Sequence, residues 1–416
     1  MSLLTTTIAP TERAAATLRP FDVVPSATQA ADRLLRQALF QPSAVAIMDA
    51  LAAILVQAGV PLARAMVGYE LIHPLIEGQG VIWRRGKTVE VETWRHDRVD
   101  TGSWERSPFY KMEVEGLLSL RLDPTDPAVV AAFPVFRDFG DLGLTDYLAL
   151  RIGFDGTDDP AQQSGIVVSL SADRDGFQPE HLVLIEQLRT PMAIAFKLAN
   201  ERHLAETVME TYHGRDAGQR ILSGRIRRGD GEWLRTVIWM SDLRNSTGLA
   251  DQLPVDRYLS VVNAYADCTA GAVLAAGGDV LEIIGDAVLG IFPVRGSNSD
   301  TDAAQRALTA ALDARARLAR LREKAECVYT RDIEFGIGIH WGELVYGNVG
   351  TPARLNFGLI GPAVNEASRL ESLTKQLKRP ILVSGAVAAL IPREWEALGP
   401  QDLRGVGRPI QVFAPA

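Results

Sequence analysis

Hydrophobic and polar positions divide the chain into two patterned stretches joined by a short polar segment. Residues 1–30 are rich in Ala, Thr, Ser and Pro and show little periodicity, which predicts a loose tail. Apolar residues then recur at helical spacing, most densely over residues 44–63. Asp49 interrupts this run and Pro61 ends it, so we expect a core helix and no membrane span.

Strand-like segments follow, and a long helical pattern closes the first stretch. The segments are AMVGYELIHP, GVIWRRG, VEVETWRH, DYLALRIGF and GIVVSLSA, which suit strands in their apolar and β-branched content. From Pro179 an apolar stripe at three- and four-residue steps predicts an exit helix with a kink at Pro191. This order resembles a GAF-type sensory domain over residues 31–200, which implies an unknown small-molecule ligand or protein partner. A plain dimerisation domain remains an open alternative.

A Gly- and Arg-rich joint, YHGRDAGQRILSGRIRRGDGE, separates the two stretches. We predict a helical linker over residues 201–232 and, as a hypothesis, a route for conformational coupling. Residues 233–416 then alternate strand-like and helix-like segments, which predicts a second domain. The fold class expected for the chain is therefore α/β (α+β) in two domains.

Composition excludes several classes of function. The 416 residues carry a formal net charge of −8, whereas a general nucleic-acid binder needs a basic face. Two cysteines, Cys268 and Cys327, are too few for a disulfide framework and fit a reducing compartment. The N-terminus lacks a charged-then-apolar signal, so we expect a cytoplasmic protein. The six histidines are scattered, and no zinc site is predicted.

The first candidate site lies in TVIWMSDLRNST, residues 236–247. A β-branched and aromatic strand ends near Ser241, so Asp242 sits at the carboxyl end of a strand, where α/β sheets place ligands. The next residues open a helix whose free amides suit phosphate groups. The phosphate-binding candidates are Leu243, Asn245, Ser246 and Thr247.

A second carboxylate occurs in LEIIGDAVLGIF, residues 281–292, which predicts a hairpin with a Gly285–Asp286 turn. Turns favour Asp for structural reasons alone. However, Asp242 and Asp286 can meet if their strands pair in antiparallel fashion. Two converging carboxylates without a nearby base favour Mg²⁺ or Mn²⁺.

A third candidate is the helix predicted after Pro362. Asn365 and Arg369 lie four residues apart and share one face of this helix. Such a pair is usually a solvated edge. It also offers an amide to a sugar oxygen and a guanidinium to a phosphoryl group.

Four motifs in order resemble the catalytic domain of the class III nucleotide cyclases: IWMSDLRNST, GGDVLEIIGDAVLGIFP, FGIGIHWGELVYGNVGTPARLNFGLIG and GPAVNEASRLE. The resemblance covers the second domain, residues 233–416. It implies a ferredoxin-like fold with an antiparallel-rich sheet and flanking helices. It also implies a lyase that uses two Mg²⁺ or Mn²⁺ ions per site, and a homodimer whose sites lie between the subunits.

The resemblance implies a role for each candidate residue. Asp242 and Asp286 match the metal-binding aspartates, with the carbonyl of Leu243 as a further ligand. Asn365 matches the residue that orients the ribose, and Arg369 matches the one that stabilises charge on the α-phosphate. Metal acids and the Asn/Arg pair come from different subunits in such cyclases.

The base-reading positions implied by the resemblance are Glu282 and Gly358. A carboxylate accepts both donors of the guanine edge, whereas it repels the N1 acceptor of adenine. We therefore expect GTP as substrate, with ATP as the alternative. The family's phosphate-binding lysine is absent near the C-terminus, where Arg404 is the substitute candidate. The Asn245-Ser246-Thr247 triplet departs from the family's usual Gly-Phe-Thr.

Two further functions stay open at this point. The domain could bind nucleotide without turning it over, or it could be a palm-type nucleotidyl transferase, which shares the two acids. The helix with Asn365 and Arg369 has no place in the palm-type site.

Overall fold

The computed structural model describes residues 26–97, 102–140, 142–154, 165–294, 299–324 and 333–416. The chain forms two compact units, Met1–Thr207 and Val208–Ala416. Most of the expected tail lies outside the described residues. Its last residues do not: Ser26 and Gln29 form a reciprocal capping box that starts α1 at Ala27, and the expected tail is wrong for this segment.

The first unit is built on one antiparallel sheet of six strands in the order β3-β2-β1-β6-β5-β4. The strands are β1 (Leu62–Glu70), β2 (Ile76–Arg84), β3 (Glu90–Arg95), β4 (Ser119–Leu122), β5 (Leu144–Gly153) and β6 (Gly165–Asp173). Apolar residues alternate along β1 and β6 and bury one face of the sheet in the main core of this unit.

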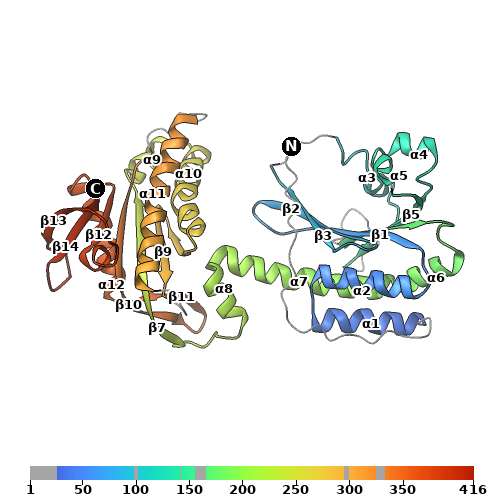
Figure 1. Ribbon diagram of the computed structural model, residues 1–416, viewed down its shortest axis with the longest axis horizontal. Helices are drawn as coiled ribbons and strands as arrows, with labels where there is room; N and C mark the ends of the chain where they lie inside the picture. The colour runs from blue at the N-terminus through green and yellow to red at the C-terminus, as the bar shows by residue number, and fades with distance from the viewer. Residues whose placement is uncertain (1–25, 98–101, 141, 155–164, 295–298, 325–332) are drawn as a thin grey trace. The chain divides into compact units, whose positions relative to one another are not determined.

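Helices cover both faces of this sheet (Figure 1). The main core lies under α1 (Ala27–Phe40), α2 (Ala44–Gln57), α6 (Pro179–Gln187) and the first half of α7 (Arg189–His213). A smaller aromatic core on the other face lies under α3 (Pro108–Val114), α4 (Pro127–Ala132) and α5 (Val135–Gly140). The expected kink at Pro191 is displaced: the break between α6 and α7 falls at Leu188, and Pro191 lies in the first turn of α7, where it is tolerated.

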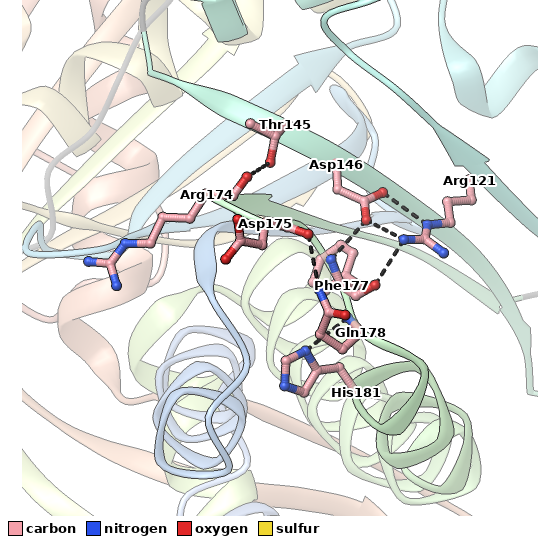
Figure 2. A network of polar contacts seen from close by, with 8 residues as sticks. All are labelled: Arg121, Thr145, Asp146, Arg174, Asp175, Phe177, Gln178 and His181. Atoms are coloured by element: carbon pink, nitrogen blue, oxygen red, sulfur yellow. Dashed lines mark hydrogen bonds and ion pairs between the residues drawn. The ribbon is translucent and has the colours of Figure 1, made fainter.

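A buried carboxylate fixes the loop between β6 and α6 to the sheet (Figure 2). Asp146 on β5 accepts hydrogen bonds from Arg121 Nη2 at 2.6 Å and from the Phe177 amide at 2.9 Å. Arg121 also donates to the Phe177 carbonyl at 2.9 Å. Gly176, at φ +70°, lets the loop pass over Asp146, because a Cβ there would lie 2.9 Å from the carboxylate.

The second unit contains an eight-stranded sheet in the order β13-β14-β12-β10-β7-β9-β8, with β11 paired to β10. The strands are β7 (Gly231–Leu243), β8 (Asp279–Ile284), β9 (Ala287–Pro293), β10 (Phe335–Thr351), β11 (Arg354–Ile360), β12 (Ile381–Ser384), β13 (Trp395–Gln401) and β14 (Ile410–Pro415). The β10–β12 pair is parallel and the other pairs are antiparallel.

The helices of the second unit are α8 (Arg215–Leu222), α9 (Ser246–Gln252), α10 (Val255–Ala275), α11 (Asp300–Lys324), α12 (Pro362–Gln376) and α13 (Gly385–Ala388). One face of the sheet packs on α10 and α11 in the largest core of this unit. The other face packs on α8 and α12. Gly336 and Gly338 bring α12 close to β10, since a Cβ at Gly338 would lie 2.9 Å from the Glu371 Cα.

These two units confirm the expected mixture of helices with antiparallel-rich sheets. Within the described ranges, no helix has the length and apolar character needed to cross a bilayer.

We expect Asp146→Ala to destabilise the first unit by about 2–4 kcal/mol, because it leaves the guanidinium and the Phe177 amide without their shared acceptor. Urea denaturation of the full chain measures the change. The matched control is Asp97→Ala, which removes an exposed partner of Arg95 and should leave the transition midpoint unchanged. Equal midpoints for both variants would show that the buried network adds no stability.

Candidate active site

Strand pairing brings the two candidate aspartates together. β7 and β9 run antiparallel, with Asp242 opposite Ala287, the residue after Asp286. The amide of Leu243 donates to the Asp286 carbonyl at 2.9 Å. Gly285 closes the β8–β9 hairpin at φ +62°, as expected for the first residue of a two-residue type II′ loop. The hairpin and the antiparallel pairing predicted from sequence are both confirmed.

The electrostatics of this pair favour a cation between the two acids. Burial, and then the facing carboxyl group of Asp286, raise the pKa of Asp242 to about 6. Both side chains are half-buried. Their oxygen donors suit a hard divalent cation, which would relieve the repulsion. In the described part of the chain no group of three or more His, Cys, Asp or Glu residues could hold a metal, so further ligands would come from backbone, water or substrate oxygens.

The amides after Asp242 are only partly available to an anion. Leu243 N–H is used by Asp286, and Arg244 N–H donates to the Glu334 carbonyl at 2.7 Å. The expectation of a free amide at Leu243 is therefore wrong. Asn245 adopts φ +57° and starts α9, so the phosphate-binding expectation now rests on Asn245, Ser246 and Thr247 at the start of this short helix.

Arg244, which the sequence analysis missed, ties this turn to α12. Its Nη1 lies 3.0 Å from Oε1 of the buried Glu371, and its Nη2 donates to Thr374. Burial raises the pKa of Glu371 to about 7, and Arg244 opposes this shift. Gly336, opposite Asp242 in the sheet, leaves the space that these side chains occupy. The turn that carries Asp242 is thus fixed against the end of α12.

The other candidates on α12 project away from this contact. Ala363, at the start of the helix, packs on Gly342 of β10, which is six residues or about 20 Å along the strand from Gly336. Asn365 and Arg369 are exposed, whereas the helix face with Ala363, Ala367, Leu370, Glu371 and Thr374 is buried. Asn365 and Arg369 share the solvent face, as predicted, and one chain does not turn them toward the Asp242 side.

A buried pair holds the first half of α12 on the sheet. His340 Nε2 on β10 lies 2.9 Å from Glu366 Oε2. Burial and then Arg408 lower the pKa of His340 to about 4, so the ring is neutral and donates Nε2–H to the carboxylate. Arg408 also opposes the rise that burial causes in the pKa of Glu366. The expected substitute Arg404 is exposed in the turn before β14, and Arg408 is the arginine whose charge reaches α12.

The two candidate base-reading positions face each other. Glu282 on β8 and Gly358 on β11 lie in strands that are not paired, yet a Cβ at Gly358 would be 3.9 Å from Glu282 Oε1. Asn356, two residues before Gly358, donates its Nδ2 hydrogen to the same oxygen at 2.5 Å. Sequence reasoning missed Asn356, although strand alternation puts it on the face of Gly358.

Helix α8 packs beneath both of these strands. Ala217 joins Leu281 and Phe357, the neighbours of the base-reading residues, in one hydrophobic cluster. The guanidinium of Arg220 lies 5.1 Å from the Tyr346 ring centroid and 6.0 Å from that of Phe357. A cation above aromatic rings in a partly desolvated site stabilises their arrangement.

The turn before α8 approaches β8 directly. Gly214 has φ +80°, and a Cβ there would lie 2.5 Å from the Val280 carbonyl oxygen. Salt bridges of Arg220 to Asp216 at 2.7 Å and to Glu232 at 2.8 Å hold the helix in place. Helix α8 and the turn before it, which were expected to be a linker, therefore pack against the strands that carry the candidate base-reading residues.

Part of the chain is similar to known proteins. Residues 235–413 match the family described as Adenylate and Guanylate cyclase catalytic domain. A protein of Anabaena cylindrica named Adenylate cyclase is 32% identical over 166 residues, which cover 39% of this chain and 32% of that protein. The chain spans well under half of the length of the curated relatives it matches.

Solved cyclase structures are also similar to a part of the chain. The adenylyl cyclase CyaB from P. aeruginosa is 25% identical, with a TM-score of 0.40 over 44% of this chain and 95% of that one. The guanylyl cyclase Cya2 is 27% identical, with a TM-score of 0.39 over 45% of this chain and 93% of that one.

We expect Asp242→Asn to stabilise the metal-free protein at pH 7.5 by about 1 kcal/mol, a value reduced for partial solvent screening. The raised pKa means that ionised Asp242 is unfavourable above about pH 6, and the amide removes this cost. The advantage should fade as the pH falls through 6 and the native carboxyl group gains its proton. Urea denaturation in EDTA at pH 7.5 and pH 5 measures both effects.

The control is Asp251→Asn, because Asp251 is exposed on α9 and its loss should change neither value. An Asp242→Asn protein that is less stable than the native chain at pH 7.5 contradicts the repulsive pair.

Proposed function

We propose that the chain is a lyase that converts GTP to 3′,5′-cyclic GMP and pyrophosphate. Its residues 235–413 match the family of adenylate and guanylate cyclase catalytic domains. The observation that carries the cyclase chemistry is the pair of half-buried carboxyl groups, Asp242 and Asp286, at the end of β7. The preference for GTP rests on a separate contact, that of Glu282 with Asn356 beside Gly358.

In the proposed reaction the ribose 3′-oxygen attacks the α-phosphorus, the bond to pyrophosphate breaks, and the 3′-hydroxyl proton passes to solvent. Two Mg²⁺ or Mn²⁺ ions, when bound by Asp242, Asp286 and the Leu243 carbonyl, supply charge neutralisation and a lower pKa for the 3′-hydroxyl. Asn365 orients the ribose through its amide. Arg369 places its guanidinium on the α-phosphate, where negative charge grows.

The proposed enzyme is a homodimer. The exposure of Asn365 and Arg369 on the far side of α12 supports a site in which they serve the acids of a second copy. Each chain carries both halves, so a two-fold pair has two equivalent sites. Exposed apolar side chains near the site, including Ile283, Ile284 and Ile360, are consistent with a surface that another subunit covers.

Guanine is the proposed base because of what surrounds Glu282. The Asn356 amide holds Oε1, which orients the carboxylate so that it accepts from guanine N1–H and the 2-amino group. Gly358 adds no side chain and leaves room for the O6 edge. The second candidate is ATP cyclisation, which the name of the Anabaena relative favours.

The first unit is proposed to regulate the second. Its antiparallel six-stranded sheet between two helical layers is consistent with a GAF-like sensory domain. We also infer a cytoplasmic location, because Cys268 is a free, buried thiol and the sequence holds too few cysteines for a disulfide framework. Cys327 lies outside the described residues.

Substrate choice is tested by parallel turnover of GTP and ATP with Mn²⁺. We expect the native chain to prefer GTP, and Glu282→Lys to lose that preference by a factor of about 100 or more, because an ammonium donor then meets the donors of guanine. The matched control is Glu343→Lys, an exposed glutamate on β10 that should leave the ratio unchanged. Formation of mainly cyclic AMP by the native chain would refute the assignment of guanine as the base. Absence of any cyclic product from folded dimers would refute the proposed cyclase activity.

The shared site is tested by mixing two inactive variants, Asp242→Asn and Arg369→Ala. In half of the random dimers one site combines native acids with a native Arg369, so the mixture should recover about a quarter of the native activity. Two Asp242→Asn preparations mixed together provide the control and should stay inactive. Failure to recover activity, despite subunit exchange seen by mass spectrometry, indicates that each site lies within one chain.

A further inference from the structure

A row of four polar side chains crosses the sheet of the first unit. Arg84 on β2, Arg64 on β1, Ser171 on β6 and Tyr147 on β5 are direct neighbours in the strand register. Residues directly opposite each other in antiparallel strands point to the same face. This is the face with the aromatic core, since the Tyr147 ring lies 5.0 Å from that of Phe136 on α5.

Arg64 is a half-buried cation that has no carboxylate partner among the described residues. Its guanidinium lies 4.9 Å from the Phe139 ring centroid and donates to Ser169 Oγ at 3.5 Å. In the described part of this unit no ion pair involves Arg64. Burial lowers the pKa of Arg64, and the neighbouring Arg84 lowers it further. A buried charge that faces a like charge needs a compensating group.

Other arginines of this unit show how it normally compensates charge. Arg84 pairs with Glu90, Arg85 with Asp173 at 2.7 Å, and Arg121 with Asp146 at 2.6 Å. Figure 2 shows the last pair, in which guanidinium, carboxylate and backbone satisfy one another. Arg64 is different, because its protein contacts are a ring face and a hydroxyl group.

The Ser171 hydroxyl group beside Arg64 can donate to an anion. Ser171 is fully buried, and within the described residues its Oγ has no hydrogen-bond partner. Burial raises the pKa of Tyr147 to about 12, so the phenol keeps its proton. Buried polar atoms rarely stay unsatisfied in native proteins. The Tyr147 hydroxyl is already hydrogen-bonded to Ser169, so Ser171 is the unsatisfied hydroxyl beside Arg64. A guanidinium beside an unsatisfied hydroxyl donor is a donor set that an oxyanion satisfies.

Among the described residues, acidic groups do not take this place. Glu90 and Glu92 on β3 are the carboxylates whose charges reach Arg64. Glu90 already binds Arg84. Glu92 is on β3, which β2 separates from the strand of Arg64, and it lies opposite Gly80 of β2. A stacked Arg64–Phe139 contact alone would stabilise the fold, but it would leave Ser171 unsatisfied and the Arg64–Arg84 repulsion in place.

We propose that the first unit binds a small organic carboxylate at Arg64 and Ser171, beside the Tyr147 ring. The carboxylate accepts from the Arg64 fork and the Ser171 hydroxyl, and its apolar body packs among Phe136 and Phe139. The site is independent of nucleotide turnover, since each of its residues belongs to the first unit.

The test measures binding to the full chain by isothermal titration at constant ionic strength in chloride. Benzoate, acetate and inorganic phosphate are the three probes. We expect saturable binding in the order benzoate, acetate, phosphate, because the apolar walls favour the ring. Preference for phosphate would overturn the carboxylate assignment, and absence of saturable binding for all three would overturn the site.

Variants separate the site from non-specific binding. Arg64→Met should weaken benzoate binding about a hundredfold, and Ser171→Ala about tenfold. The matched control is Arg85→Met, which removes a paired arginine in the turn after β2 and should leave binding unchanged. Equal losses for Arg64→Met and Arg85→Met would refute the assignment.

Arg64→Lys provides a second test in case the Arg64→Met variant does not fold. It keeps the charge, so circular dichroism should be native, and it should bind benzoate more weakly than the native chain because it lacks the bidentate fork. Native affinity in folded Arg64→Lys together with native affinity in Ser171→Ala would exclude the proposed contacts. Nucleotide turnover is not a readout here, so a failure of this binding test would not bear on the cyclase proposal, and a failure of the cyclase proposal would not bear on this test.

Discussion

The close packing of α12 on β10 is the constraint on which the catalytic unit depends. Gly336 and Gly338 remove the side chains that would separate helix and strand. The space that they leave is filled by Glu371 and Thr374, which bind Arg244 in the turn after Asp242. One contact therefore fixes both the end of β7 and the direction in which α12 presents its exposed face.

Local patterns explain why much of this unit was predictable. Asp242 and Asp286 each end an apolar strand, and a two-residue Gly-Asp loop leaves few ways to pair these strands. The start of α1 in the first unit was missed, although Ser26 and Gln29 have capping-box spacing that indicates a helix start. The contact of Glu282 with Asn356 was not predictable in this way, since it joins residues 74 positions apart in strands that are not paired. It depends on where the β10–β11 hairpin places β11 relative to β8, and periodicity carries no information on that placement.

The two units treat buried charge in different ways. Asp146 is satisfied within the fold by Arg121 and a backbone amide, which is typical of a structural network. Asp242 and Asp286 repel each other in the free protein, and Arg64 lacks an anionic partner among the described residues. Uncompensated charge of this kind lowers stability and is retained where a bound group supplies the opposite charge.

Gly214 has a consequence for how such proteins exchange their parts. The last turn of α7 belongs to the same compact unit as the catalytic sheet, and Gly214 then meets the Val280 carbonyl, two residues before Glu282. A different input domain grafted after Gly214 would remove this contact from the base-reading strand. A graft within α7, before Val208, would preserve it. The natural junction for recombination is thus inside α7 and not in the Gly- and Arg-rich segment that follows it. The last turn of α7, and so the rotational orientation of this helix, would be inherited with the catalytic unit.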